Sequence, residues 1–221
     1  MERGWGDLVK GGFMLSVVIP TYMDKVVSSE IGKIFTDMGY DAQVIISTDD
    51  PHVGKGNALK EGLKYAEGEY ILFMDADLQI PPQEVKSFFK QMDLYDADAV
   101  IGNKHHSYSN IRYTTWRKIV SLGYRTFIQV LFHLNIKDTQ CGFKLFKREP
   151  LLLIADKLMT NRYATDLEII IALKESGFRV VDAPIYVKKQ INRGSVSLKS
   201  IWTIIIDTLK IWWLKQKGFY G

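Results

Sequence analysis

The sequence has a single cysteine, Cys141, so it cannot form an internal disulfide. A chain that folds without disulfides is typical of a reducing compartment. The sequence also lacks an uninterrupted apolar run of about 20 residues, the length that a helix needs to cross a bilayer. Its first residues contain no basic and then apolar leader, so we expect no signal peptide.

The charge and the composition are both close to those of ordinary globular proteins. The net charge is only +4, which does not favour a nucleic-acid partner. There is no low-complexity tract and no repeat of solenoid length, and 221 residues suit one large domain rather than two. We expect a Gly-rich extension over residues 1–13, one folded domain over 14–196 and an amphipathic helix over 197–221.

Short apolar strands alternate with amphipathic helices along the first half of the chain. Strands are expected over residues 15–20, 43–47, 70–74 and 99–102, and helices over 26–38, 57–66 and 83–92. Such alternation predicts an α/β fold with a mainly parallel sheet and helices on both of its faces. The less regular second half has expected helices over 114–133, 165–176 and 198–216, with strands within 138–147 and over 178–182.

Two carboxylates follow directly on the apolar strand over residues 70–74. Asp75 and Asp77 are spaced i, i+2, so in an extended chain their side chains share one face. Open α/β sheets bind ligands beyond the carboxyl ends of their strands, and clustered carboxylates there suit Mg²⁺ or Mn²⁺ bridged to phosphates. Gln79 adds a neutral oxygen. The alternative is a solvated turn before the helix that two prolines open.

Several segments of the chain occur together, in this order, in one enzyme family. They are residues 16–22, 49–50, 54–59, 75–79 and 138–146. Together they resemble family 2 glycosyltransferases of the GT-A fold, and within these the branch that acts on polyprenyl phosphates, which includes dolichyl-phosphate glucosyltransferases and mannose synthases. The last segment is especially similar to the glucosyltransferase members. The resemblance covers roughly residues 14 to 215.

The resemblance implies a nucleotide-sugar site in the loops that follow the strands. The residues that it implicates in binding the nucleotide sugar are Pro20, Thr21, Tyr22, Asp24, Asp49, Lys55, Asp75, Ala76 and Asp77. Asp49 matches the carboxylate that hydrogen-bonds the base, while Asp75, Asp77 and Gln79 match the metal and diphosphate site. A divalent ion there stabilises the negative charge that develops on the leaving diphosphate. Lys55 is alternatively a solvated residue at the start of a helix.

Two departures from the family pattern concern the nucleotide pocket. Met23 and Asp24 replace the usual Asn-Glu pair, although Asp24 keeps a carboxylate. The helix and strand that the family places between Asp49-Asp50 and the Gly-Lys-Gly segment are missing. We therefore expect a sheet that is shortened by one edge strand and a nucleotide pocket with a shorter wall.

The kind of acceptor determines which further residues take part. A lipid phosphate is already an anion and needs a cationic clamp, whereas a hydroxyl acceptor needs a general base. The resemblance implies a phosphate clamp of Lys104, Arg117 and Arg193, and it places Asp166 where members with hydroxyl acceptors keep their base. The alternatives are ordinary surface cations and an Asp166 that binds a hydroxyl of the donor sugar. The predicted catalytic set is Asp77, Asp166 and Arg117.

Two further residues have structural interpretations. Glu168, close to Asp166, is expected to favour the N-terminus of its helix electrostatically. Cys141 is expected to be a small residue in a buried turn, because nothing nearby indicates an activated thiol.

The last helix mixes apolar and charged residues in a way that suits a membrane interface. Trp202, Trp212 and Trp213 accompany Lys215 and Lys217 there, and the expected helix over 114–133 has a similar mixture. We expect a protein that is peripheral at a cytoplasmic membrane face. The alternative packs both helices into the core or into an interface between copies, which leaves a homo-oligomer open.

The sequence thus predicts a metal-dependent, inverting glycosyltransferase. It would move a hexose from a nucleoside diphosphate sugar, UDP-glucose or GDP-mannose, to a polyprenyl phosphate. One alternative is transfer to a sugar or protein hydroxyl with Asp166 as the base. The other is a non-catalytic, nucleotide-binding protein that is associated with a membrane.

Overall fold

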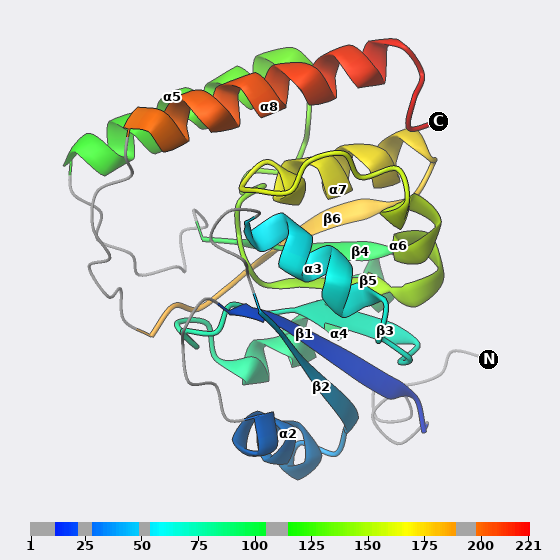
Figure 1. Ribbon diagram of the computed structural model, residues 1–221. Helices are drawn as coiled ribbons and strands as arrows, with labels where there is room; N and C mark the ends of the chain where they lie inside the picture. Colours follow the sequence, from blue (N-terminus) through cyan, green and yellow to red (C-terminus); the bar gives the residue numbers. More distant parts are fainter. Residues whose placement is uncertain (1–11, 22–27, 49–53, 105–114, 189–197) are drawn as a thin grey trace.

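A mixed six-stranded sheet forms the centre of the computed structural model, which describes residues 12–21, 28–48, 54–104, 115–188 and 198–221 (Figure 1). The strands lie in the order β2-β1-β3-β5-β4-β6. They are β1 (Met14–Thr21), β2 (Asp41–Thr48), β3 (Tyr70–Phe73), β4 (Ala99–Asn103), β5 (Lys144–Lys147) and β6 (Val180–Pro184). Only β5 runs antiparallel to its neighbours, so the sheet is mainly parallel as predicted.

The helices follow the predicted pattern to within a few residues, apart from one addition. They are α2 (Ser28–Asp37), α3 (Lys55–Leu63), the 3₁₀ turn η1 (Pro82–Glu84), α4 (Val85–Leu94), α5 (Thr115–Phe132), α6 (Arg148–Ala155), α7 (Thr165–Glu175) and α8 (Leu198–Gln216). The sequence pattern does not predict α6. Its four consecutive apolar residues, 151–154, have no helical period and cannot be distinguished from a buried strand.

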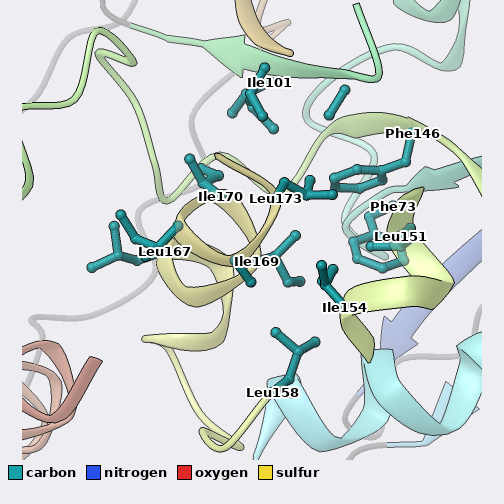
Figure 2. Packing of buried hydrophobic residues seen from close by; sticks show 14 of the residues in the cluster. Phe73, Ile101, Phe146, Leu151, Ile154, Leu158, Leu167, Ile169, Ile170 and Leu173 are labelled. Atoms are coloured by element: carbon teal, nitrogen blue, oxygen red, sulfur yellow. The ribbon is translucent and has the colours of Figure 1, made fainter. Parts of the chain in front are cut away.

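Both faces of the sheet are covered, which is why its central strands are apolar throughout. In β3, Ile71 and Phe73 face a core cluster with residues of α3, α6 and α7, while Leu72 faces a second cluster with residues of α2 and α4. Figure 2 shows the first cluster, in which Phe73 and Phe146 lie beside side chains of α6 and α7. The expected helices on both faces of the sheet are therefore present.

Strand β2 is the outermost strand on one side of the described sheet. The family pattern would place a further helix and strand between β2 and α3, but here β2 ends at Thr48 and α3 begins at Lys55. The described part of the chain thus has the shortened edge that the sequence predicts.

Helices α5 and α8 lie side by side along one side of the molecule (Figure 1). The hydroxyls of Tyr124 on α5 and Thr208 on α8 are 3.0 Å apart. Helix α8 also packs on α7, and Ile211 and Tyr220 are fully buried in the first core cluster. The last helix therefore contributes one face to the core. No helix in the described ranges has the length and apolarity that crossing a membrane requires.

Candidate active site

Asp75 follows the carboxyl end of β3. Its carboxylate lies in the space beside Gly142, which is free because Gly142 has no side chain. A Cβ atom at Gly142, in the turn before β5, would lie 1.9 Å from Asp75 Oδ2. The register explains the approach, because Phe73 on β3 is opposite Lys144 on the antiparallel strand β5. Gly142 is thus required for the position of Asp75.

Asp75 is paired with Lys55 from the first turn of α3. The Lys55 ammonium donates to Asp75 Oδ1 at 2.8 Å and lies 3.7 Å from Asp166 Oδ2. The structure thus brings together two predicted site residues, Asp75 and Asp166, through a third. Lys55 is three-quarters buried, so the alternative interpretation of Lys55 as a solvated residue is wrong, whereas the side chain of Asp75 is two-fifths exposed.

Lys144 extends this ion pair into a network that the sequence analysis missed. Its side chain is completely buried, and its ammonium donates to Asp166 Oδ1 and to the carbonyl of Cys141. A lysine is almost never fully buried without a partner, so a lone lysine in the apolar strand 144–147 is a signal that points to such a pair. Two carboxylates and two ammonium groups alternate along the resulting charge network, which is made of Asp75, Lys55, Asp166 and Lys144.

The surrounding charges keep both Asp75 and Lys55 ionised. Burial alone would raise the pKa of Asp75, but the ammonium of Lys55, with those of Lys104 and Lys144, outweighs it and lowers that pKa to about 2. For Lys55, burial acts to lower the pKa, and the carboxylates of Asp166 and Asp75 outweigh it and raise that pKa above its usual value. At neutral pH both partners therefore stay ionised.

Asp77 and Gln79 form a tight turn after β3. The Gln79 amide nitrogen donates to Asp77 Oδ2 at 2.9 Å, and the Gln79 backbone N–H donates to Asp77 Oδ1 at 3.2 Å. Ala76, between the two aspartates, is half-buried. The described residues include no group of three or more His, Cys, Asp or Glu side chains arranged to hold a metal. A metal at this turn would therefore depend on Asp75, Asp77 and Gln79.

Two glycines bring the segment with Lys55 against the turn before α7. A Cβ atom at Gly56 would lie 1.9 Å from Thr165 Oγ1, and one at Gly54 would lie 2.9 Å from the Asn161 carbonyl. Gly54 also has a backbone φ of 108°, a value that residues with a side chain rarely adopt. These close approaches place Lys55 within reach of both Asp75 and Asp166.

The predicted phosphate clamp is described only in part. Lys104 follows β4, its backbone N–H donates to Asp138 Oδ2 at 3.1 Å, and its charge helps to lower the pKa of Asp75. Arg117 belongs to α5, but its side chain lies outside the described part of the structure, as does the whole of Arg193. Lys104 is thus the one predicted clamp cation that the structure places at the site.

The predicted nucleotide residues are also described in part. Pro20 and Thr21 are buried at the carboxyl end of β1, at the same edge of the sheet as Asp75. Tyr22, Asp24 and Asp49 lie outside the described residues.

Two further side chains are fully buried. Glu168 lies in the first turn of α7, where a carboxylate favours the helix N-terminus as expected, and its buried carboxylate also accepts hydrogen bonds from Thr160 and from the Tyr220 hydroxyl. Cys141 is buried as predicted, and burial raises the pKa of its thiol to about 11.

Comparisons with known proteins show what the chain is similar to. The model of the family described as "Glycosyl transferase family 2" matches residues 28–153. A dolichyl-phosphate beta-glucosyltransferase of Trichomonas vaginalis is 29% identical over 167 residues, which are 72% of this chain and 50% of that protein. A dolichyl-phosphate beta-glucosyltransferase of Dictyostelium discoideum is 36% identical over 126 residues, which are 53% of this chain and 38% of that protein. This chain thus matches half or less of the length of these two relatives.

The fold is also found among solved structures. Glucosyl-3-phosphoglycerate synthase from Mycobacterium tuberculosis, in complex with Mn²⁺, UDP-glucose and phosphoglyceric acid, has a TM-score of 0.69 with 16% identity. The match covers 99% of this chain and 86% of that one. At so low an identity the likeness shows that the two proteins share a fold.

Proposed function

Because the chain belongs to glycosyl transferase family 2 and has its GT-A fold, we propose that it is an inverting transferase that moves a hexose from a nucleoside diphosphate sugar to dolichyl phosphate or a related polyprenyl phosphate. The observation that carries the proposal is the charge network, because it holds two ammonium groups among the predicted donor and acceptor residues. The names of the two curated relatives support glucose as the sugar and a lipid phosphate as the acceptor.

The donor side fits a divalent cation. Asp75 and Asp77 offer carboxylate oxygens, the ligands that Mg²⁺ and Mn²⁺ prefer, and the absence of a side chain at Gly142 leaves Asp75 its space. These two residues, with Gln79, would hold Mg²⁺ or Mn²⁺, which would neutralise charge on the diphosphate leaving group. The Mn²⁺ and UDP-glucose in the M. tuberculosis complex support this assignment.

Lys55 is the group of the chain that is best placed to meet the diphosphate directly. Its ammonium lies between Asp75 and Asp166 and remains partly exposed, so a phosphate oxygen can reach it. A fixed ammonium beside the leaving group stabilises the negative charge that develops there. We propose that Pro20, Thr21, Tyr22, Asp24, Asp49 and Ala76 complete the nucleotide site.

The environment of Asp166 favours an acceptor that is already an anion. One carboxylate oxygen of Asp166 accepts from Lys144 and the other lies 3.7 Å from Lys55. Both oxygens of Asp166 therefore already face an ammonium group, which leaves less room for a hydroxyl acceptor beside them, and a phosphate acceptor needs no general base. Lys104, with Arg117 and Arg193, would hold that phosphate opposite the diphosphate for an inverting displacement.

A lipid acceptor requires contact with a membrane, and α8 has a surface that suits it. Its outer face, defined by Trp202, Ile206, Leu209 and Trp213, is exposed and follows the spacing i, i+4, i+7, i+11 of one helix face. Lys217 Nζ lies 3.8 Å from the centre of the Trp213 ring, and Lys210 is also exposed. We propose that the outer face lies on an anionic lipid surface, because Trp and Lys together suit the interface.

The test is a transfer screen with the purified chain. UDP-glucose and GDP-mannose are each offered with Mn²⁺ and a short polyprenyl phosphate, the corresponding polyprenol, or no acceptor. Transfer to the phosphate and not to the alcohol supports the proposal. Transfer to the alcohol supports the hydroxyl acceptor, and absence of both transfer and donor hydrolysis supports the non-catalytic alternative.

A further inference from the structure

We propose that Tyr220 is a positioning residue for the donor loop, residues 54–57, and that it acts through the buried carboxylate of Glu168. The inference rests on the proposed function, because it takes Lys55 in this loop to be a ligand of the donor diphosphate. Tyr220 is more than 160 residues away from the loop along the chain, and its hydroxyl donates to Glu168, which is not a member of the charge network.

The first link joins Tyr220 to Glu168. Both side chains are completely buried, and the Tyr220 hydroxyl donates to Glu168 Oε1 at 2.7 Å. Burial, followed by the charge of Glu168, raises the pKa of Tyr220, so the phenol stays a neutral donor. The Tyr220 carbonyl accepts from Ser176 Oγ at 2.8 Å and from Lys157 Nζ at 3.1 Å. The residues after α8 are therefore fixed beside Glu168.

The second link joins Glu168 to the turn before α7. Its Oε1 accepts from the Met159 N–H at 2.9 Å, and its Oε2 accepts from the Thr160 N–H at 2.8 Å and from Thr160 Oγ1 at 2.6 Å. Tyr220 is thus one of four donors to a single buried carboxylate. Hydrogen bonds to a charged group are stronger than neutral ones, and a buried acceptor that loses a donor destabilises the structure around it.

The third link joins that turn to the donor loop. The Asn161 carbonyl accepts from the Asn57 N–H at 3.0 Å, and Lys60 Nζ donates to Asn161 Oδ1. Thr165 Oγ1 donates to the Thr160 carbonyl at 3.0 Å and occupies the space beside Gly56. A shift of residues 159–161 therefore moves the backbone on both sides of Lys55.

Through these links, the carboxylate of Glu168 connects the segment after the last helix to the donor loop. The outer face of helix α8 is exposed. The segment after α8 is joined through Tyr220 and Glu168 to the turn over residues 159–161, which contacts residues 54–57. A coupling between Tyr220 and the donor loop is demonstrated by a measured effect of one on the other, and not by a continuous series of contacts alone. Changing the single hydroxyl of Tyr220 gives that evidence, because it leaves the aromatic ring in place.

The experiment compares Tyr220→Phe with a matched control, Tyr124→Phe. The control also removes one tyrosine hydroxyl that ties α8, but its partner is Thr208 and not Glu168. The dissociation constants of UDP and GDP are measured by calorimetry with Mn²⁺, and hydrogen exchange is followed at the Asn57 amide. We expect Tyr220→Phe to weaken binding of the preferred nucleotide about threefold to tenfold, because only part of the cost of one lost charge-assisted hydrogen bond reaches the nucleotide site. It should also speed exchange at Asn57, and Tyr124→Phe should do neither.

Equal effects of the two variants, or unchanged nucleotide affinity and Asn57 exchange in Tyr220→Phe, would overturn the inference. If Tyr220→Phe does not fold, Ser176→Ala replaces it. This variant removes one of the two hydrogen bonds to the Tyr220 carbonyl and leaves the one from Lys157, and it should change both readouts in the same direction, whereas no change overturns the inference. A wild-type chain that binds neither nucleotide contradicts the proposed function instead, and the exchange at Asn57 then decides the positioning role alone.

Discussion

Lys144 shows how a single residue can determine the chemistry of a neighbouring carboxylate. It is buried at the centre of the sheet, and Asp166 neutralises it while also facing Lys55. This arrangement bears on the proposed role of Asp166, because each of its carboxylate oxygens faces an ammonium group. A residue that the motif analysis did not select therefore bears on the choice between a phosphate and a hydroxyl acceptor.

We expect Lys144→Met to lower the free energy of unfolding by about 3 kcal/mol, because the buried Asp166 carboxylate loses its directly bonded ammonium and keeps only the more distant one of Lys55. Urea denaturation of the variant and of the double variant Lys144→Met/Asp166→Leu measures the effect. The double variant should recover much of the loss, since it removes both charges. Lys64→Met, which breaks an exposed pair with Glu61, is the control and should leave stability unchanged. A Lys144→Met chain as stable as the wild type would contradict the importance of the pair.

Asp77 tests the donor site, since it follows directly on β3 and its carboxylate accepts two hydrogen bonds from Gln79 in the same turn. We expect Asp77→Ala to lose transfer and metal-dependent nucleotide binding while it keeps its fold. Calorimetry with UDP, with and without Mn²⁺, measures the loss, and circular dichroism checks the fold. Asp96→Ala, which changes a highly exposed aspartate, is the control and should behave as wild type. Full transfer by Asp77→Ala, or by the wild type in excess chelator, would refute the metal site.

Arg117 tests the acceptor. We expect Arg117→Ala to raise KM for the polyprenyl phosphate about tenfold, as for the loss of one charged hydrogen bond, while slow hydrolysis of the donor continues. Its neighbour Lys118→Ala is the control. A pH–rate profile with an acidic limb that disappears in Asp166→Asn, with Arg117→Ala unchanged, would favour the hydroxyl acceptor.

At the scale of elements, α8 combines a buried face with an exposed apolar face. Ile211 lies in the core cluster, whereas Trp202 and Trp213 are exposed on the outer face. Removing the helix would therefore open the core and would say little about membranes. Substitutions confined to the outer face separate the two roles, because they leave Ile211 and Tyr220 in place.

We expect Trp202→Gln/Trp213→Gln to bind vesicles with anionic lipid at least about tenfold more weakly than the wild type, with an unchanged melting temperature. Binding of the wild type should also weaken as salt rises, because the lipid charge contributes to it. Co-sedimentation measures both effects. The control is Leu94→Gln, which changes an exposed apolar residue of α4. Equal binding by the double variant, or a wild type that ignores the vesicles, would place the outer face elsewhere, for example against a second copy.

The elements also show which parts of the fold the sequence could predict. Periodicity located most helices and strands to within a few residues, since one face of each is buried. It could not reveal α6 or the antiparallel direction of β5, because an apolar run such as residues 151–154 fits either structure and strand direction depends on distant partners. The same limit applies to the site. Motifs identified Asp75, Asp77 and Lys55, whereas the pairing of Lys144 with Asp166 and of Glu168 with Tyr220 joins residues that are far apart in the chain.

At the scale of the whole molecule, the sheet order assembles the site from strands of different parts of the chain. β3 delivers Asp75, β5 delivers Lys144 and β4 leads to Lys104, and these three strands are adjacent. Helices α3 and α7 add Lys55 and Asp166 from one side of the sheet. The site is thus a product of the complete fold. The domain boundaries at residues 14, 196 and 197 remain a proposal. The first core cluster contains residues from both sides of the boundary at residues 196 and 197.

We expect the described domain and α8 to unfold in one transition, because Ile211 and Tyr220 belong to the same core cluster as Phe73. Three of the five tryptophans, 202, 212 and 213, are in α8, so tryptophan fluorescence reports mainly on this helix. Urea unfolding curves from fluorescence and from far-ultraviolet circular dichroism should therefore coincide. An earlier fluorescence transition would mean that α8 separates from the rest of the domain.

Gly142 affects how related sequences can be sorted. Any side chain at this position would overlap the carboxylate of Asp75, so the two positions are a matched pair although 67 residues separate them. A sequence that carries both aspartates of the motif, but a larger residue at the position of Gly142, cannot place the first aspartate as this chain does. This one glycine thus offers a simple criterion for separating chains that can build the site from chains that only share the motif.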